Sequence, residues 1–291
     1  GKQMAKHKVK GLAVAVVDGK GLVWANGYGE ADEARGVPMG PDTVVNLGSG
    51  AKLFTALGAM SLAGQGRLEL DAPASSVLPG LGLSSFAQEG AQVTPRRIMT
   101  HHAGLPANHF KGLYSRKREP APLTPEALAD VHMAFRPGTV FSFSNLGTAI
   151  LGMMVEKQAG EPFASWMDKA VFGPMGLADT SYAPRAAWQD RLAVSYGSSG
   201  PLATPGSNQA PAVSLYSTAR DQARFLAAVL GAPGAGLPQN VTRAALAGML
   251  APQNTGVPLD MDLRVGLGWN LNRPAFGPAG TVAWNFGRLA G

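Results

Sequence analysis

The residues whose types and spacing are best suited to catalysis are Ser49 and Lys52, which form the one Ser-x-x-Lys sequence in this chain. Residues three apart in a helix share a face, so Lys52 would stand one turn beyond the Ser49 hydroxyl. A serine hydroxyl is a weak nucleophile until a base takes its proton, and a desolvated lysine is able to be that base. The spacing predicts a nucleophile and its base, although a helix cap followed by a surface lysine gives the same pattern.

The element that must hold this pair is a helix beginning near Ser49. Leu53, Leu57 and Met60 recur at helical spacing after it, and Gly64 is a residue type that ends helices. Backbone N–H groups at the start of such a helix are available to a developing oxyanion. The same segment therefore predicts both the nucleophile and part of the group that stabilises its transition state.

Strands are predicted at both ends of the chain and helices in its middle. The apolar segments 11–17 and 22–25 flank turn residues, which is typical of a hairpin, and glycines at 27, 29 and 36 indicate a loop after it. This order favours an α/β (α+β) fold in which an antiparallel sheet, closed by both ends of the chain, is flanked by helices and carries a helical lobe. The remaining predicted elements are helices at 2–9, 124–133, 145–158, 162–170, 217–230 and 240–250, and strands at 264–269 and 280–284.

We expect residues 1–291 to form a single discontinuous domain. Its α/β lobe would comprise residues of about 1–60 and 210–291, and its helical lobe residues of about 61–209, because no clean linker separates them. With 45% hydrophobic and 15% charged residues, such a chain is able to bury a sizeable core.

The composition also excludes or disfavours several classes of site and partner. The chain has no cysteine, which excludes disulfides, thiolate metal sites and a cysteine nucleophile. Its net charge is +6, but the lysines and arginines are scattered and no aromatic residues interleave with their small clusters, so we expect no nucleic-acid partner. No apolar run of about 18 residues is present, so we expect no transmembrane segment. The sequence specifies neither location nor oligomeric state.

Two adjacent histidines, His101 and His102, suggest a metal site at first sight. Adjacent residues diverge on any regular element, and no Asp or Glu accompanies them at ligand spacing. We therefore expect a structural role in the loop before Gly104, with no metal and no organic cofactor. Leu47 stands where a Gly-x-Ser-x-Gly elbow around Ser49 would have its first glycine, which disfavours the α/β-hydrolase fold.

The surroundings of Ser49 resemble the group of serine β-lactamases, penicillin-binding proteins (DD-peptidases) and family VIII esterases. The resemblance runs from about residue 10 to the C-terminus, and the matching segments follow the family's order. It implies the β-lactamase/DD-peptidase fold, with an acyl-enzyme on Ser49 and Lys52 as its base. The segments that carry it are 45–56, 66–71, the Thr-His-x-x-Gly-Leu-Pro segment 100–106, 136–147, 172–180, 216–221 and 265–269.

One departure from the family pattern concerns the second motif, usually Tyr-x-Asn or Ser-x-Asn. The hydroxyl of its first residue moves protons between nucleophile, leaving group and water, but here Phe143 stands in that position. Asn145 is kept, and the resemblance implies that it orients a substrate amide. Since acid–base catalysis by a positioned group contributes about 10²–10⁴-fold, we expect the loss of the hydroxyl to cost rate on that scale.

A second departure concerns the third motif, usually Lys-x-Gly or His-x-Gly. The matching segment places Asn285 at the cationic position, followed by Gly287. The resemblance implies that the N–H of Arg288 completes an oxyanion hole with the N–H of Ser49. Relatives continue with further strands and a helix, so either a C-terminal part lies beyond Gly291 or the sheet is short by some strands.

Two functions fit these observations. One is a serine hydrolase that takes small-molecule esters, β-lactams or peptide-like amides through a Ser49 acyl-enzyme, with a turnover that Phe143 and Asn285 impair. The other is a catalytically silent binding or regulatory protein on the same fold. The intact Ser49–Lys52 pair favours the enzyme, and the two replaced positions favour the silent alternative.

Overall fold

The computed structural model describes residues 2–83, 92–115, 120–197, 199–272 and 282–288. Its longest strands form a hairpin near the N-terminus, in which β1 (Gly11–Asp18) pairs antiparallel with β2 (Gly21–Asp32), and β3 (Val37–Pro38) pairs with the end of β2. A second antiparallel sheet contains β10 (Arg264–Val265), β11 (Asn270–Asn272) and β12 (Val282–Trp284). The two sheets share no strand pairing among the described residues.

Three further strand pairs are short and antiparallel. The pair closest to the nucleophile joins β4 (Val45–Asn46) to β9 (Tyr216–Ser217). The others join β5 (Tyr114–Ser115) to β8 (Gly206–Ser207), and β6 (Ser195–Gly197) to β7 (Gly200–Leu202).

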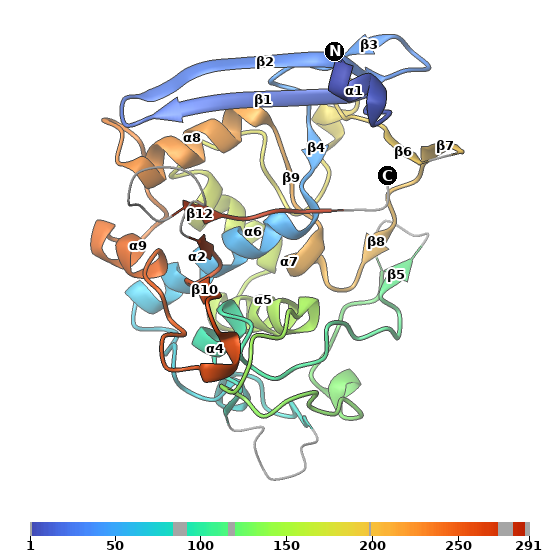
Figure 1. Cartoon of the computed structure of the whole chain (residues 1–291). Helices are drawn as coiled ribbons and strands as arrows, with labels where there is room; N and C mark the ends of the chain where they lie inside the picture. The colour runs from blue at the N-terminus through green and yellow to red at the C-terminus, as the bar shows by residue number, and fades with distance from the viewer. Residues whose placement is uncertain (1, 84–91, 116–119, 198, 273–281, 289–291) are drawn as a thin grey trace.

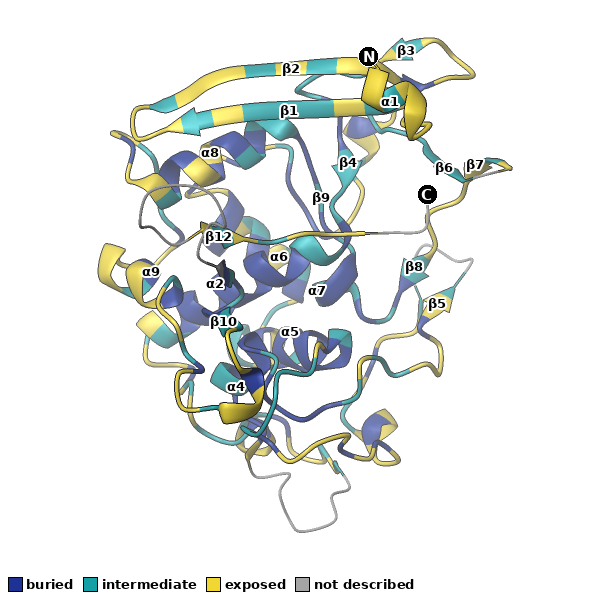
Figure 2. Ribbon diagram, in the orientation of Figure 1, coloured by how far each residue is buried: buried dark blue, intermediate teal, exposed yellow. Residues whose placement is uncertain are grey.

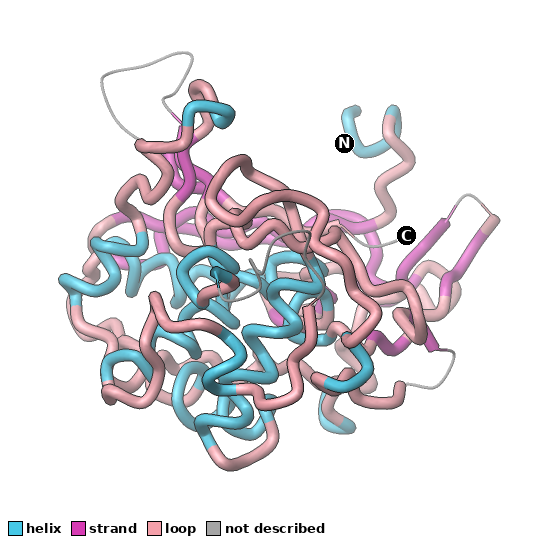
Figure 3. The backbone as a smooth tube through the Cα atoms, turned by 90° about the horizontal axis from the view of Figure 1, so that it is seen from below, coloured by secondary structure: helices cyan, strands magenta, loops and turns pink. Residues whose placement is uncertain are grey.

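Helices occupy the space below the hairpin. Figure 1 shows α8 directly under β1 and β2, with α2 in the middle of the molecule and α5 below it. Seen from below, the helices group together and long loops surround them (Figure 3). The helices are α1 (Lys2–Lys6), α2 (Ala51–Gly64), α3 (Ala74–Val77), α4 (Pro95–Met99), α5 (Asn145–Ala159), α6 (Phe163–Met167), α7 (Ala210–Val213), α8 (Ala219–Leu230) and α9 (Arg243–Met249). None of the described helices is long and apolar enough to cross a lipid bilayer.

The centre of the hydrophobic core is α2. Every residue from Ala51 to Leu62 is buried, and the core continues into α5, so that both helices are dark in Figure 2. Gly58 permits the close approach of α6, because a Cβ at this position would lie 2.5 Å from the Met167 sulfur. A helix enclosed on all sides gives the side chains of its first turn a rigid support.

The structure confirms the predicted helices after Ser49 and at 145–158, and shorter forms of those at 162–170, 217–230 and 240–250. The predicted helix 124–133 is wrong, since only the 3-10 turn Glu126–Leu128 forms there. Beyond that turn, the N–H groups of Ala134 and Phe135 donate to the Gly104 carbonyl, which diverts the chain from helical pairing.

The predicted loop at glycines 27 and 29 is also wrong, because both lie inside β2. Neighbouring backbone passes very close to both glycines. A Cβ on Gly27 would lie 2.0 Å from Met39 O, and a Cβ on Gly29 would lie 2.1 Å from Lys10 O. These glycines permit strand packing and do not form a turn.

The predicted sheet is antiparallel as expected but is divided in two. Strands from the two chain ends form separate sheets, and the predicted strand 264–269 is limited to residues 264–265, because Gly268 turns the chain with a φ of 80°. Residues 280 and 281 of the predicted strand 280–284 lie outside the described residues. The division into two lobes stays a prediction, and its first boundary, near residue 60, falls within α2.

Candidate active site

Ser49 stands at the entrance to α2, in the 3-10 turn Gly48–Gly50. Strand β4 leads directly into this turn, and Leu47 N donates to Leu215 O at 2.7 Å. Asn46 Oδ1 accepts from Gly48 N at 2.9 Å, and Gly48 adopts a φ of 54°, which is costly for residues with a side chain. The nucleophile predicted from the sequence is therefore held on a tightly turned backbone at the start of a buried helix.

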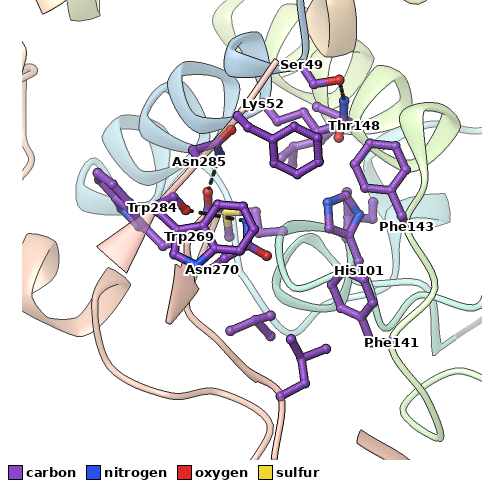
Figure 4. Close-up of a pocket in the computed structure, with 17 residues that line it drawn as sticks. Ser49, Lys52, His101, Phe141, Phe143, Thr148, Trp269, Asn270, Trp284 and Asn285 are labelled. Carbon is purple, nitrogen blue, oxygen red and sulfur yellow. Dashed lines mark hydrogen bonds between the residues drawn. The ribbon is translucent and has the colours of Figure 1, made fainter. Parts of the chain in front are cut away.

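The amine of Lys52 lies beside the Ser49 hydroxyl. Nζ is 3.0 Å from Ser49 Oγ and donates to Ala212 O at 2.9 Å (Figure 4). The side chain is 6% exposed, and burial lowers the pKa of Lys52 from 10.5 to about 7. Because burial disfavours the charged form, a large fraction of this amine is neutral near pH 7 and able to accept the serine proton.

A buried set of hydroxyl groups ties the first turn of α2 to α7. Tyr182 donates its hydroxyl to Ala51 O at 2.7 Å and lies 2.7 Å from Thr55 Oγ1. Thr55 in turn donates to Pro211 O at 2.6 Å. Since Ala212 follows directly in α7, these bonds fix the carbonyl that orients Lys52 relative to the helix that carries it.

The pair faces a cavity of about 350 Å³. Most of its walls are aliphatic or aromatic, contributed by α4, α5, the loop before α5, and the C-terminal sheet (Figure 4). The described lining residues are Ser49, Lys52, Ile98, Met99, His101, Phe141, Phe143, Thr148, Leu151, Leu263, Val265, Gly268, Trp269, Asn270, Trp284, Asn285 and Phe286.

Phe143 lines the cavity next to the amine. The centre of its ring is 4.7 Å from Lys52 Nζ, and the side chain is 39% exposed. An aromatic face beside an ammonium group is a favourable contact, but the ring offers no hydroxyl to transfer a proton. The group expected from the second motif is therefore replaced by an apolar wall.

His101 also faces the cavity, which the sequence reasoning did not predict. Its ring centre is 4.9 Å from that of Phe143, and Nδ1 accepts from Ser144 N at 3.2 Å, which assigns the ring proton to Nε2. Burial, Lys52 and His102 lower the pKa of His101 to about 3, so this ring is neutral at ordinary pH. Its placement depends on a φ of 60° and on contacts with residues some 40 positions later, for which the sequence gives no local signal.

His102 has the structural role predicted for it. Its side chain is buried, and Nε2 is 2.7 Å from Asp260 Oδ2. The other carboxylate oxygen of Asp260 accepts from Phe141 N at 2.7 Å. The pair therefore anchors the loop that carries the aromatic residues of the cavity. Among the residues that the structure describes, no group of three His, Asp or Glu side chains is arranged to hold a metal ion.

The two motif asparagines have other partners. Asn145 begins α5, donates to Asn108 Oδ1 at 2.8 Å, and is absent from the described cavity lining. Asn285 does line the cavity, but its amide donates to Gly268 O at 2.9 Å. Both side-chain NH2 groups are thus engaged within the protein, whereas the buried Asn145 Oδ1 has no hydrogen-bond partner among the described residues.

The segment containing Gly287 and Arg288 lies against the turn at Ser49. A Cβ on Gly287 would lie 1.6 Å from Leu47 O, so only glycine fits there. A Cβ on Gly48 would lie 3.2 Å from Arg288 N and 3.1 Å from Arg288 O. The N–H groups of Ser49 and Arg288, which the family resemblance pairs as an oxyanion hole, therefore belong to segments that lie side by side.

The chain is similar to known proteins over most of its length. A family model described as Beta-lactamase matches residues 1–288. The chain is 34% identical over 192 residues to penicillin-binding protein 4 of Amycolatopsis lactamdurans (66% of this chain, 49% of the relative), and 28% identical over 273 residues to esterase EstB of Burkholderia gladioli (80% and 69%). It spans about half the length of the first of these curated relatives.

The fold is shared with solved structures as well. A β-lactamase/D-alanine carboxypeptidase from Pseudomonas syringae superimposes with a TM-score of 0.78 at 23% identity, over 95% of this chain and 74% of that one. A class C β-lactamase from Rhodobacter sphaeroides gives a TM-score of 0.76 at 24% identity, over 95% and 74%. At this level of identity the likeness shows the fold, and the fold class predicted from the sequence is confirmed.

Proposed function

The chain belongs to the β-lactamase family, and from this premise we propose that it is a serine hydrolase that forms an acyl-enzyme on Ser49. The observation that carries the proposal is the 3.0 Å separation of Ser49 Oγ and Lys52 Nζ at the edge of a cavity. The lowered pKa of Lys52 supports its role as the base.

The proposed reaction has two halves. Neutral Lys52 takes the Ser49 proton as Oγ bonds to the substrate carbonyl carbon, and the Ser49 and Arg288 N–H groups donate to the oxyanion. The tetrahedral species then expels the leaving group, which takes its proton from the Lys52 ammonium. Water attacks the ester in the same manner and regenerates Ser49. No metal or organic cofactor takes part.

Phe143 shapes the expected rate of this cycle. Without a hydroxyl at that position, Lys52 must both remove and return each proton, so we expect slow turnover and an acyl-enzyme that persists. In the proposal Asn145 and Asn285 orient the substrate. Asn285 would give up the hydrogen bond that it donates to Gly268 O, whereas Asn145 Oδ1 has no partner among the described residues and is available as an acceptor. The substrate classes are those that the names of relatives state, namely an ester, a penicillin-like amide or a D-alanyl-D-alanine peptide.

A second candidate is a binding protein that keeps the fold without turnover. The specific observations in its favour are the Phe143 ring over the Lys52 amine and the engaged amide of Asn285. It differs from the first candidate in a measurable way, because it would bind small carbonyl compounds without acylation of Ser49.

The test is hydrolysis of a chromogenic short-chain ester and of a chromogenic cephalosporin by the purified chain. Ser49→Ala is the informative variant, and Ser76→Ala, at an exposed position in α3, is its matched control. We expect turnover of at least one reagent that falls about 10³-fold or more in Ser49→Ala and is unchanged in Ser76→Ala. Equal turnover in both variants would remove Ser49 from the mechanism, and no turnover of either reagent would favour the silent alternative.

A further inference from the structure

We propose that the cavity selects uncharged esters with aromatic or branched apolar groups, and discriminates against substrates that carry a carboxylate on the leaving group. The inference rests on the proposed function and specifies its substrate class. Penicillins and peptides that end in a free carboxyl group belong to the class it disfavours.

The first argument is the charge of the cavity. Among the described residues that line it, Lys52 is the only lysine or arginine. Its amine must be neutral to take the Ser49 proton, and a carboxylate bound beside it would favour the charged form and raise its pKa. A carboxylate substrate bound beside Lys52, the one lysine or arginine among the described lining residues, would therefore keep the base in its charged form.

The second argument is the amide at the family's cationic position. Asn285 is held by its bond to Gly268 O, and an amide supplies no net positive charge to a carboxylate in any orientation. His101 does not supply a charge either, because its Nδ1 is occupied by Ser144 N–H and its ring is neutral. It presents an N–H donor, which suits a carbonyl or ether oxygen as well as a charged one.

The third argument is the chemistry of the walls. Trp284 and Phe286 stack with ring centres 5.6 Å apart at the rim, where they are 37% and 59% exposed, and Phe143 lies beside the amine. Burial of an aromatic or aliphatic substrate group against these rings lowers the free energy of binding. A carboxylate covered by these rings and away from Lys52 loses part of its hydration without gaining a charged partner, which is unfavourable.

The test uses two esters that differ in one charge: the phenylacetyl esters of methyl 3-hydroxybenzoate and of 3-hydroxybenzoate. We expect kcat/KM of the intact chain to be at least about tenfold higher for the uncharged ester, in line with the cost of an unpaired carboxylate. A ratio below about tenfold would overturn the inference and leave the proposed function in place, provided that Ser49→Ala abolishes both activities. No hydrolysis of either ester would overturn both.

A pair of variants tests the role of position 285. Asn285→Lys adds a cation to the cavity, whereas Asn26→Lys adds the same charge at an exposed site on β2. We expect Asn285→Lys to lower the ratio of uncharged to charged ester about tenfold or more, and Asn26→Lys to leave it unchanged. Equal ratios in the two variants would contradict the inference. The values of kcat/KM of the unmodified chain for the two esters test the inference separately, whether or not either variant folds.

Discussion

Replacement of Lys52 by methionine should stabilise the fold in a manner that depends on pH. In the unfolded chain this lysine has a pKa near 10.5, and burial lowers the pKa in the folded protein to about 7. Between these values the unfolded chain binds more protons, so the free energy of unfolding contributed by Lys52 rises with pH by up to about 1.4 kcal/mol per pH unit. The penalty for burying this amine is therefore greatest at and below pH 7 and disappears near pH 10.5.

Methionine has a stem of similar length and no titrating group. The gain in unfolding free energy from Lys52→Met should thus shrink by about 3 kcal/mol between pH 7 and pH 9.5. This is slightly less than the maximal slope times the pH interval, because the slope decreases as the pH approaches either pKa. Because Lys52 is only 6% exposed, solvent screening does not reduce this figure substantially.

The assay is urea unfolding of wild type and variant at pH 7, 8 and 9.5. Other titrating groups are common to both proteins, so the difference between the two curves isolates position 52. Lys20→Met, at an exposed position in the turn between β1 and β2, is the control for the loss of one lysine at the surface. A constant difference for Lys52→Met would refute the reasoning that burial, and hence a lowered pKa, prepares this lysine as a base.

Three further predictions follow from the same geometry. Phe143→Tyr should restore a proton-carrying hydroxyl and raise the rate of deacylation about 100-fold, as measured by the decay of the acyl-enzyme. The control Phe110→Tyr, at an exposed position, should leave that rate unchanged, and equal decay in the two variants would contradict this role. Gly287→Ala would bring a Cβ to 1.6 Å from Leu47 O, so it should slow acylation or lower the urea midpoint, and wild-type values for both would show that this segment is free to shift. Ser144→Ala removes the N-cap bond to Gly147 N and should cost about 1 kcal/mol in urea unfolding, with no loss refuting the capping role.

The sequence was most informative where structure is decided locally. The helix that carries Ser49 and Lys52 follows from apolar residues at helical spacing, and the structure places the two side chains 3.0 Å apart. The helix predicted at 145–158 is likewise confirmed as α5, and the structure shows Ser144 as its N-cap and Gly160 as its C-cap. The order of the predicted strands and helices favoured the fold class, and the family motifs then specified the β-lactamase/DD-peptidase fold.

The sequence was least informative where distant segments meet. Gly27 looks like a turn residue until the backbone of Met39 is seen beside it. His101 faces the cavity because of its own left-handed backbone and a bond from Ser144, and Asn145 points to Asn108. Each of these features depends on which chain segments become neighbours, and a single sequence does not contain that information in readable form.

The measurement that tests the central claim most directly is the mass of the intact protein after mixing with an activated phenylacetyl ester, followed by peptide mapping. The account predicts a gain of one phenylacetyl group on the peptide that contains Ser49, slow loss of that group, and no gain in Ser49→Ala. An unmodified protein, a label on another residue, or an equal gain in Ser49→Ala would contradict it.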